Sequence, residues 1–98
     1  MSNVTFQTAD GKSIHAEFEG PDEGPAGGIV LLQEYWGLND HIKGLTRRLA
    51  RAGFFVVAPD LYHGEVAQDA TSAKELMNAL DTLTAVREIA AAANYLRS

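Results

Sequence analysis

Two short stretches of the sequence combine acidic, aromatic and imidazole side chains, and each directly follows an apolar run. Glu34, Tyr35 and Trp36 lie in "LLQEYWGLND", and Tyr62 and His63 lie in "PDLYHG". A carboxylate or an imidazole can hold or move a proton, and aromatic rings can line a pocket. These residue types could therefore belong to an active site at the end of the apolar runs. The plainer alternatives are that Glu34 is solvated or caps a helix and that the aromatic rings pack against a sheet.

The apolar runs before both stretches predict two parallel strands that would bring these residues to one edge. "GIVLLQ" and "FFVVAP" are short and rich in branched and aromatic residues, as in strands that are covered on both faces. Between them, Asn39 or Asp40 can cap a helix that closes at Gly53. The apolar face of this helix would consist of Ile42, Leu45 and Leu49. The resulting strand–helix–strand unit should be a right-handed crossover, with Glu34 and Tyr62 at the carboxyl edge of the sheet.

The residues before the first of these runs predict an antiparallel hairpin. Apolar and polar residues alternate over residues 4–8 and 14–18, and the Asp-Gly pair of "ADGK" favours a tight turn between them. Residues 20–28 hold four of the nine glycines and two of the three prolines. This composition predicts a surface loop that connects the hairpin to the rest of the sheet.

The last third of the sequence predicts helices. After a loop at residues 60–70, Ser72 and Glu75 have the spacing of a capping box. A break is expected near Asp81 and Thr82, because either residue can cap a second helix. The predicted buried stripe consists of Leu76, Leu80, Leu83, Val86, Ala90, Ala93 and Leu96. The predicted order of elements is β-β-β-α-β-α-(α), an α/β fold of three layers with helices on both faces of the sheet.

Composition limits the class of protein. Residues 1–98 form a single domain with 46% hydrophobic residues, and 13 acidic against eight basic residues give a net charge of −5. The basic residues form no run that could follow a phosphate backbone, so nucleic acid is not an expected partner. The sequence has no cysteine, no signal-peptide pattern and no apolar stretch of the roughly 20 residues that would span a bilayer. We expect a soluble, cytoplasmic protein that does not bind membranes.

Three segments together resemble the amino-terminal half of a dienelactone hydrolase family protein, a branch of the α/β-hydrolases. These segments are "IVLLQEYWGLN", "LARAGFFVVAPDLYHG" and "REIAAAANYLRS". The first two at this separation carry most of the resemblance, which extends over the chain from about Val4. It implies a partial α/β-hydrolase sheet and hydrolysis of ester or lactone bonds in small carboxylated substrates.

The resemblance also implies roles for individual residues. Glu34 matches the active-site glutamate that engages the nucleophile in the resting enzyme. Tyr35 matches the position whose backbone N–H helps to form the oxyanion hole, a donor that is worth on the order of 3 kcal/mol. Trp36 and Tyr62 would line the substrate pocket, although packing is the alternative for both. No bound cofactor is implied, because the family chemistry needs none and the sequence has no Gly-x-Gly-x-x-Gly phosphate loop.

The histidines match no catalytic position of the family, whose catalytic histidine comes late in the chain. His63 is therefore expected to be an exposed loop residue, while His41 should begin the first helix and His15 should lie in the hairpin. Histidines this scattered offer no spacing for a metal site.

The nucleophile itself is not found in the sequence. α/β-Hydrolases carry it in a Gly-x-Ser-x-Gly elbow or the cysteine equivalent, and none of the four serines has such a frame. The 98 residues alone are therefore expected to be inactive, and whether the missing nucleophile is Cys or Ser stays open. The strand at residues 29–33 should have a bare edge. Two hypotheses follow: a hydrolase completed by a further segment or chain, or a non-catalytic module that associates through this edge, with an inactive fragment as the remaining alternative.

Overall fold

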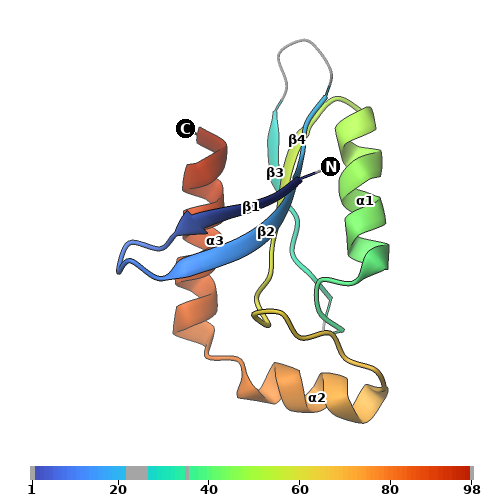
Figure 1. The fold of residues 1–98 in the computed structure, drawn as a ribbon, viewed down its shortest axis with the longest axis vertical. Helices are drawn as coiled ribbons and strands as arrows, with labels where there is room; N and C mark the ends of the chain where they lie inside the picture. Colours follow the sequence, from blue (N-terminus) through green and yellow to red (C-terminus); the bar gives the residue numbers. More distant parts are fainter. Residues whose placement is uncertain (1, 22–26, 35, 98) are drawn as a thin grey trace.

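The computed structural model describes residues 2–21, 27–34 and 36–97. Its elements follow the predicted order, with four strands in one sheet and three helices. The strand order in the sheet is β1-β2-β4-β3. Figure 1 shows α1 and α3 on opposite sides of the sheet and α2 across its lower end.

The predicted hairpin is present. β1 (Ser2–Gln7) pairs antiparallel with β2 (Ser13–Glu19). Gly11, the glycine of the predicted Asp-Gly pair, has a positive φ of +86° in the connecting turn. β1 ends one residue earlier than predicted because Thr8 joins this turn, where its N–H donates to the Lys12 carbonyl at 2.9 Å.

The predicted crossover strands lie side by side and are parallel. β3 (Gly28–Val30) pairs with β4 (Phe55–Pro59), and β4 pairs on its other side with β2 in the antiparallel sense. The prediction that the third strand continues to Gln33 was wrong, because regular pairing ends at Val30. The Gln33 side chain instead accepts a hydrogen bond from the Leu61 N–H at 3.0 Å, so this stretch turns toward the next loop.

α1 (Asp40–Arg51) covers one face of the sheet. Asn39 is its cap, since its side-chain oxygen accepts from the Ile42 N–H at 3.1 Å. Gly53, with a φ of +107°, follows the helix end as predicted. Ile42 packs with Ala58 of β4 in a hydrophobic cluster of the core.

α2 (Ala70–Ala79) begins earlier than predicted. The Ser72–Glu75 capping box is not the helix start, because the Asp69 carboxylate accepts from the Ser72 N–H at 2.7 Å and caps the helix instead. Ser72 therefore lies in the first turn. Both residues are good caps, and the carboxylate farther upstream is the one that is used.

α3 (Thr82–Arg97) covers the other face of the sheet, and the predicted break before it is confirmed. Ala92 packs there with Ala16 and Val57. The predicted stripe was wrong at Leu83 and Val86, whose side chains are more than half exposed, whereas Leu96 of the same stripe packs on the core. The face of α3 that is buried carries Ala85, Glu88, Ala91 and Ala92. Short alanine side chains let a helix pack closely on a sheet.

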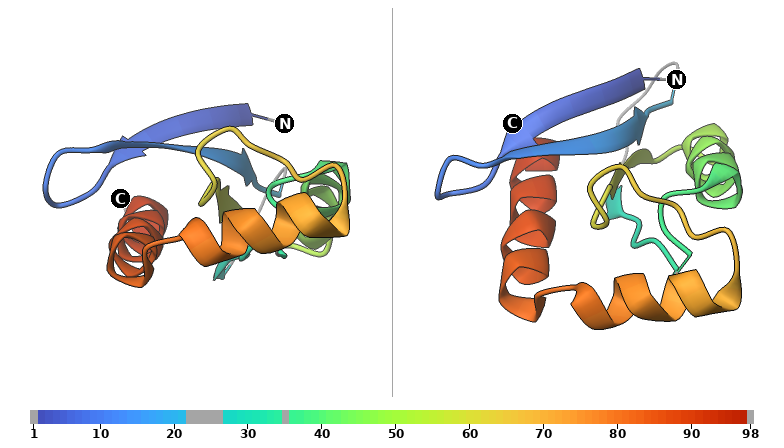
Figure 2. Two further views of the ribbon diagram at one scale, coloured as in Figure 1. Left: turned by 90° about the horizontal axis from the view of Figure 1, so that it is seen from below. Right: turned by 60° about the horizontal axis from the view of Figure 1, so that its bottom comes forward.

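The structure thus has three layers, with the sheet between α1 and α3. Figure 2 shows the two helices on either side of β3 and β4 in both views. Neighbouring residues of β4 point to opposite faces, so Val57 meets α3 while Ala58 meets α1. Within the described ranges, none of the helices has the length and apolar character that crossing a bilayer would require.

Candidate active site

The loop between β3 and α1 contains a tight turn that starts four residues after the end of β3. The Gly37 N–H donates to the Glu34 carbonyl at 3.0 Å, and the Asn39 N–H donates to the Gly37 carbonyl at 2.9 Å. Gly37 has a φ of +104°, a conformation that residues with a Cβ rarely adopt. The turn therefore leads straight into the cap of α1, and Glu34 is the residue at which it starts.

The Glu34 side chain projects into solvent. It is 62% exposed, and its Oε1 lies 3.9 Å from Nε2 of His41 in the first turn of α1. An exposed pair at this distance holds a side chain only weakly. The carboxylate is thus available to a group that approaches the carboxyl end of β3.

A second loop, after β4, is bonded to this turn on both sides of Glu34. The Leu61 N–H donates to the side-chain oxygen of Gln33, and the Ala67 N–H donates to the Trp36 carbonyl at 2.8 Å. Residues 61–67 therefore form a backing for the Glu34 turn. The prediction that the two polar stretches meet at one edge of the sheet is confirmed by these two bonds.

The aromatic residues of the two loops differ in how much surface they present. Tyr62 is buried, and its ring lies 3.3 Å from where a Cβ on Gly37 would stand. Burial raises the pKa of the Tyr62 hydroxyl above its ordinary value. Trp36 is only partly buried. Tyr35, predicted to supply the oxyanion-hole N–H, lies outside the described residues.

Sequence reasoning missed Glu88, an acidic residue on the buried face of α3. The His63 ring is 58% exposed, as expected of a loop residue, but its Nε2 lies 2.7 Å from Oε2 of Glu88, whose side chain is only 3% exposed. Glu88 falls three residues after Ala85 and three before Ala91, a spacing that could have indicated its burial.

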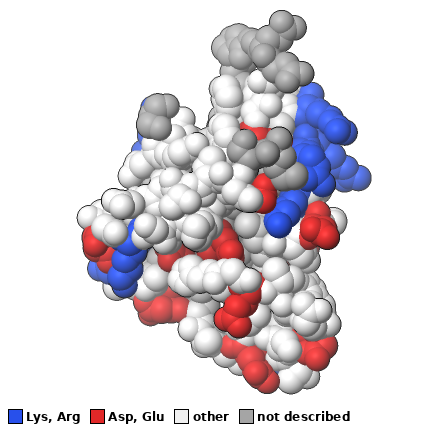
Figure 3. Space-filling view, viewed as in Figure 1, with Lys and Arg blue, Asp and Glu red and all other residues white. Residues whose placement is uncertain are grey.

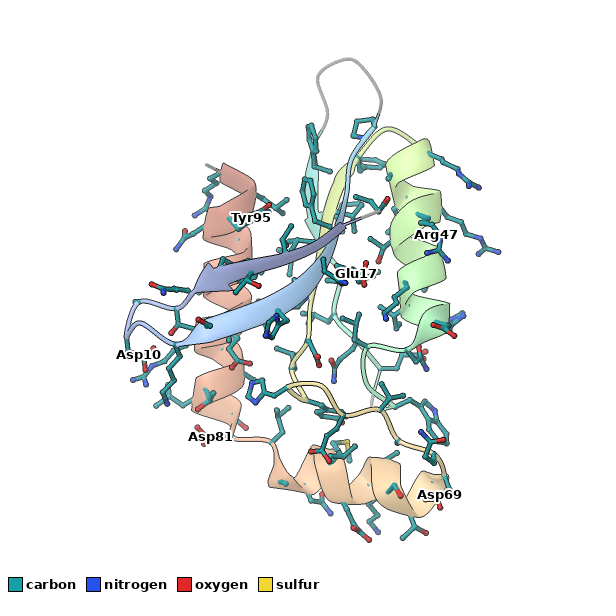
Figure 4. All side chains as sticks on the ribbon, viewed as in Figure 1. Asp10, Glu17, Arg47, Asp69, Asp81 and Tyr95 are labelled. Carbon is teal, nitrogen blue, oxygen red and sulfur yellow. The ribbon has the colours of Figure 1, made fainter. Side chains whose placement is uncertain are left out.

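Basic side chains are concentrated on α1. This helix carries four basic residues, Lys43, Arg47, Arg48 and Arg51, and one acid, Asp40. Figure 3 shows basic side chains gathered over α1, a smaller basic group at the lower left beside acidic side chains, and further acidic side chains over the lower end. Figure 4 shows Glu17 between the sheet and α1, where its Oε1 lies 3.8 Å from the Lys43 ammonium.

Among the residues that the structure describes, no group of three or more His, Asp or Glu could hold a metal ion. Two hollows are lined by described residues. One of about 230 Å³ is lined by Phe18, Phe55, Tyr95 and Leu96, and one of about 390 Å³ lies between residues 65–68 and α2.

Comparisons with known proteins agree on one family. A model of the dienelactone hydrolase family matches residues 14–98. A stretch of 62 residues is 42% identical to the "Putative carboxymethylenebutenolidase" of Saccharolobus solfataricus, covering 63% of this chain and 24% of that protein.

Solved structures show the same relationship. The "Dienelactone Hydrolase-like Promiscuous Phosphotriesterase P91", from metagenomic libraries, matches 99% of this chain and 43% of its own with a TM-score of 0.68 and 28% identity. The "Putative Dienelactone Hydrolase" of Klebsiella pneumoniae matches 98% of this chain and 42% of its own, with a TM-score of 0.65 and 25% identity. The chain thus spans less than half the length of the relatives it matches.

Proposed function

The chain belongs to the dienelactone hydrolase family, and we propose that it forms the oxyanion side of a hydrolase of ester or lactone bonds in small carboxylated substrates. The observation that carries this proposal is the Glu34 turn, which lies between a parallel strand and a helix and is backed by the loop at residues 61–67. Strand-to-helix turns at this edge can aim backbone N–H groups at the oxygen that becomes negative during acyl transfer.

In this proposal each residue of the turn has a separate role. The Glu34 carboxylate engages the nucleophile in the resting enzyme, and the N–H of Tyr35 donates to the oxyanion that forms when the nucleophile attacks the carbonyl carbon. Trp36 and Tyr62 bound the substrate pocket. The nucleophile, the acid and the histidine that complete the reaction come from outside these 98 residues, since the sequence has no cysteine and no Gly-x-Ser-x-Gly elbow.

Complementation tests this proposal. The chain is mixed or co-expressed with a polypeptide that carries the nucleophile, acid and histidine of a family member, and hydrolysis of a chromogenic ester and of a five-membered lactone is followed. We expect activity in the complex and a loss of about 10²-fold with Glu34→Ala, the size typical of a positioned active-site group.

A matched control separates the site from general damage. Glu75 is an exposed glutamate on α2, and Glu75→Ala should leave the activity of the complex unchanged. A verified complex without hydrolytic activity, or one in which Glu34→Ala is as active as the original, would contradict the proposal.

The exposed edge of β3 favours a second candidate function. β3 is an edge strand of the sheet, and Leu32, two residues after its end, is 48% exposed. An unpaired apolar edge can accept a strand from another chain. We propose as the alternative that the chain is a non-catalytic module that forms homo-oligomers through this edge.

A further inference from the structure

Glu88 is an unusual residue to find on the buried side of α3. It lies between Ala85 and Ala91 on the face that packs on the sheet, and its side chain is 3% exposed. Within the described residues, its Oε1 is buried and has no hydrogen-bond partner. A buried carboxylate is costly unless it is paired, so the Glu88–His63 contact is the feature that compensates for this burial.

His63 reaches Glu88 from a loop conformation that is itself uncommon. Among the described residues, His63 is the only one other than glycine that has a positive φ, at 53°. Residues with a Cβ seldom occupy this region, although histidine does so more often than most. The adjoining turn is held by the Asp60 carboxylate, which accepts from the Gly64 N–H at 2.7 Å. The backbone at residue 63 thus presents the ring to α3.

The loop that carries His63 is the one that backs the Glu34 turn. Leu61 and Ala67, on either side of His63, donate the two bonds to Gln33 and to the Trp36 carbonyl. A continuous chain of contacts therefore runs from Glu88 on α3 through His63 to the backbone on both sides of Glu34. The alternative is that the pair only anchors the loop to α3 and stabilises the fold.

We propose that His63 and Glu88 are positioning residues for the Glu34 turn, which they hold in place through the loop at residues 61–67. This inference rests on the proposed function and deepens it. It identifies the contact that holds the oxyanion side of the site in a fixed position relative to the nucleophile. Neither residue touches substrate in this role. The two residues are 25 positions apart in the sequence, and their contact joins the loop after β4 to α3.

Two variants weaken the contact with little change elsewhere, one by shortening the side chain and one by replacing a charge-assisted hydrogen bond with a neutral one. His63→Asn keeps a residue that tolerates a positive φ but is too short to reach Glu88. Glu88→Gln keeps the shape of the buried side chain and removes its charge. Both are made in the full 98-residue chain, and neither measurement below depends on hydrolysis, so a failure of the proposed function leaves this test intact.

The sequence contains one tryptophan, Trp36, which lies in the turn that is being tested. We expect both variants to shift the Trp36 emission and to increase its quenching by acrylamide. Hydrogen exchange at the Leu61 and Ala67 amides should accelerate about tenfold more than exchange at Val57 in the core, as expected when a charge-assisted hydrogen bond supporting a loop is lost.

Glu17→Gln is the matched control, because Glu17 is also a buried glutamate with one unpartnered oxygen within the described ranges. It should lower stability without the selective acceleration at Leu61 and Ala67. The double variant His63→Asn/Glu88→Gln should change the Trp36 signal no more than either single variant. If the single variants lower stability but leave the Trp36 emission and the relative exchange rates as in the original chain, the pair is merely an anchor and the proposal is wrong.

Discussion

Gly37 lies close against the loop behind the Glu34 turn. A Cβ at this position would stand 2.8 Å from the Glu65 carbonyl oxygen and 3.3 Å from the Tyr62 ring. The first contact is with backbone and cannot be relieved by a rotamer change. The positive φ adds a further cost for any residue other than glycine. The turn therefore requires glycine for two separate reasons.

We predict that Gly37→Ala lowers the free energy of unfolding by about 2 kcal/mol or more, because the new methyl group meets both strain and a backbone atom. Gly44 in α1 is the control, since a Cβ there would have no atom within 4 Å. Gly44→Ala should raise the free energy of unfolding by roughly 0.5–1 kcal/mol, because alanine is the better helix former. Urea denaturation measures both values, and equal effects of the two substitutions would contradict this account of the turn.

At the scale of the elements, α3 depends on the acidic residue just before it. The Asp81 carboxylate accepts from the Thr84 hydroxyl at 2.6 Å and from the Thr84 N–H at 3.1 Å. These bonds hold the pKa of Asp81 below its ordinary value of 3.8, and the bond from the Thr84 hydroxyl has the larger effect. A carboxylate with a lowered pKa in the folded state stabilises the protein above its unfolded-state pKa, and this contribution is lost as the pH falls through the folded-state value.

We predict that Asp81→Asn makes the loss of stability below about pH 4 less steep, because asparagine caps the helix without titrating. Asp81→Ala should instead lower stability at neutral pH, where the carboxylate cap is fully charged. Thermal unfolding followed by circular dichroism between pH 7 and pH 2 distinguishes the two. Asp10 and Asp69 also have lowered pKa values, so the Asp81→Asn variant should still lose some stability in acid. An unchanged acid profile of Asp81→Asn would show that the cap does not carry the pH dependence assigned to it.

At the scale of the whole molecule, the β3 edge predicts concentration-dependent association. A charge placed on an edge strand or beside it opposes pairing with another chain. We expect sedimentation velocity to detect oligomers of the original chain and fewer of them for Leu32→Lys. Leu83→Lys, a change of similar size at another exposed leucine, on α3, is the control and should leave the oligomers unchanged. A stable monomer at high concentration would argue against the association proposal.

Local patterns in the sequence were enough to predict most of the fold. The alternation in the hairpin, the apolar runs of β3 and β4 and the cap at Asn39 depend on neighbouring residues, and the structure has each of them. The errors arose where two nearby residues could equally well cap a helix, or where packing against the sheet determined which helix face is buried. Asp69 and Ser72 can both start a helix, and the buried face of α3 is chosen by contact with β4 rather than by the larger side chains of Leu83 and Val86.

The candidate site was predictable in part, because local patterns located the strands that carry it. The two polar stretches could be placed at one edge because the ends of parallel strands meet there. The Glu88–His63 contact could not, because it joins residues from a loop and a helix whose relative position depends on the complete sheet. The position of Glu88 within an alanine-rich helix face could have indicated that it is buried, but not that it contacts His63.

The central place of β4 has a consequence for the order in which the chain folds. β1 and β2 are joined by a short turn and pair Gln7 with Ser13, so this hairpin can close within about microseconds. β4 must instead find both β2, across the whole β3–α1 segment, and β3, across α1, and the pairing of Glu17 with Ala58 closes a much longer loop. The rate-limiting step should therefore be the insertion of β4 between its two neighbours. Since the loop of Trp36 is tied to the residues that follow β4, its fluorescence would record the end of folding and not its beginning.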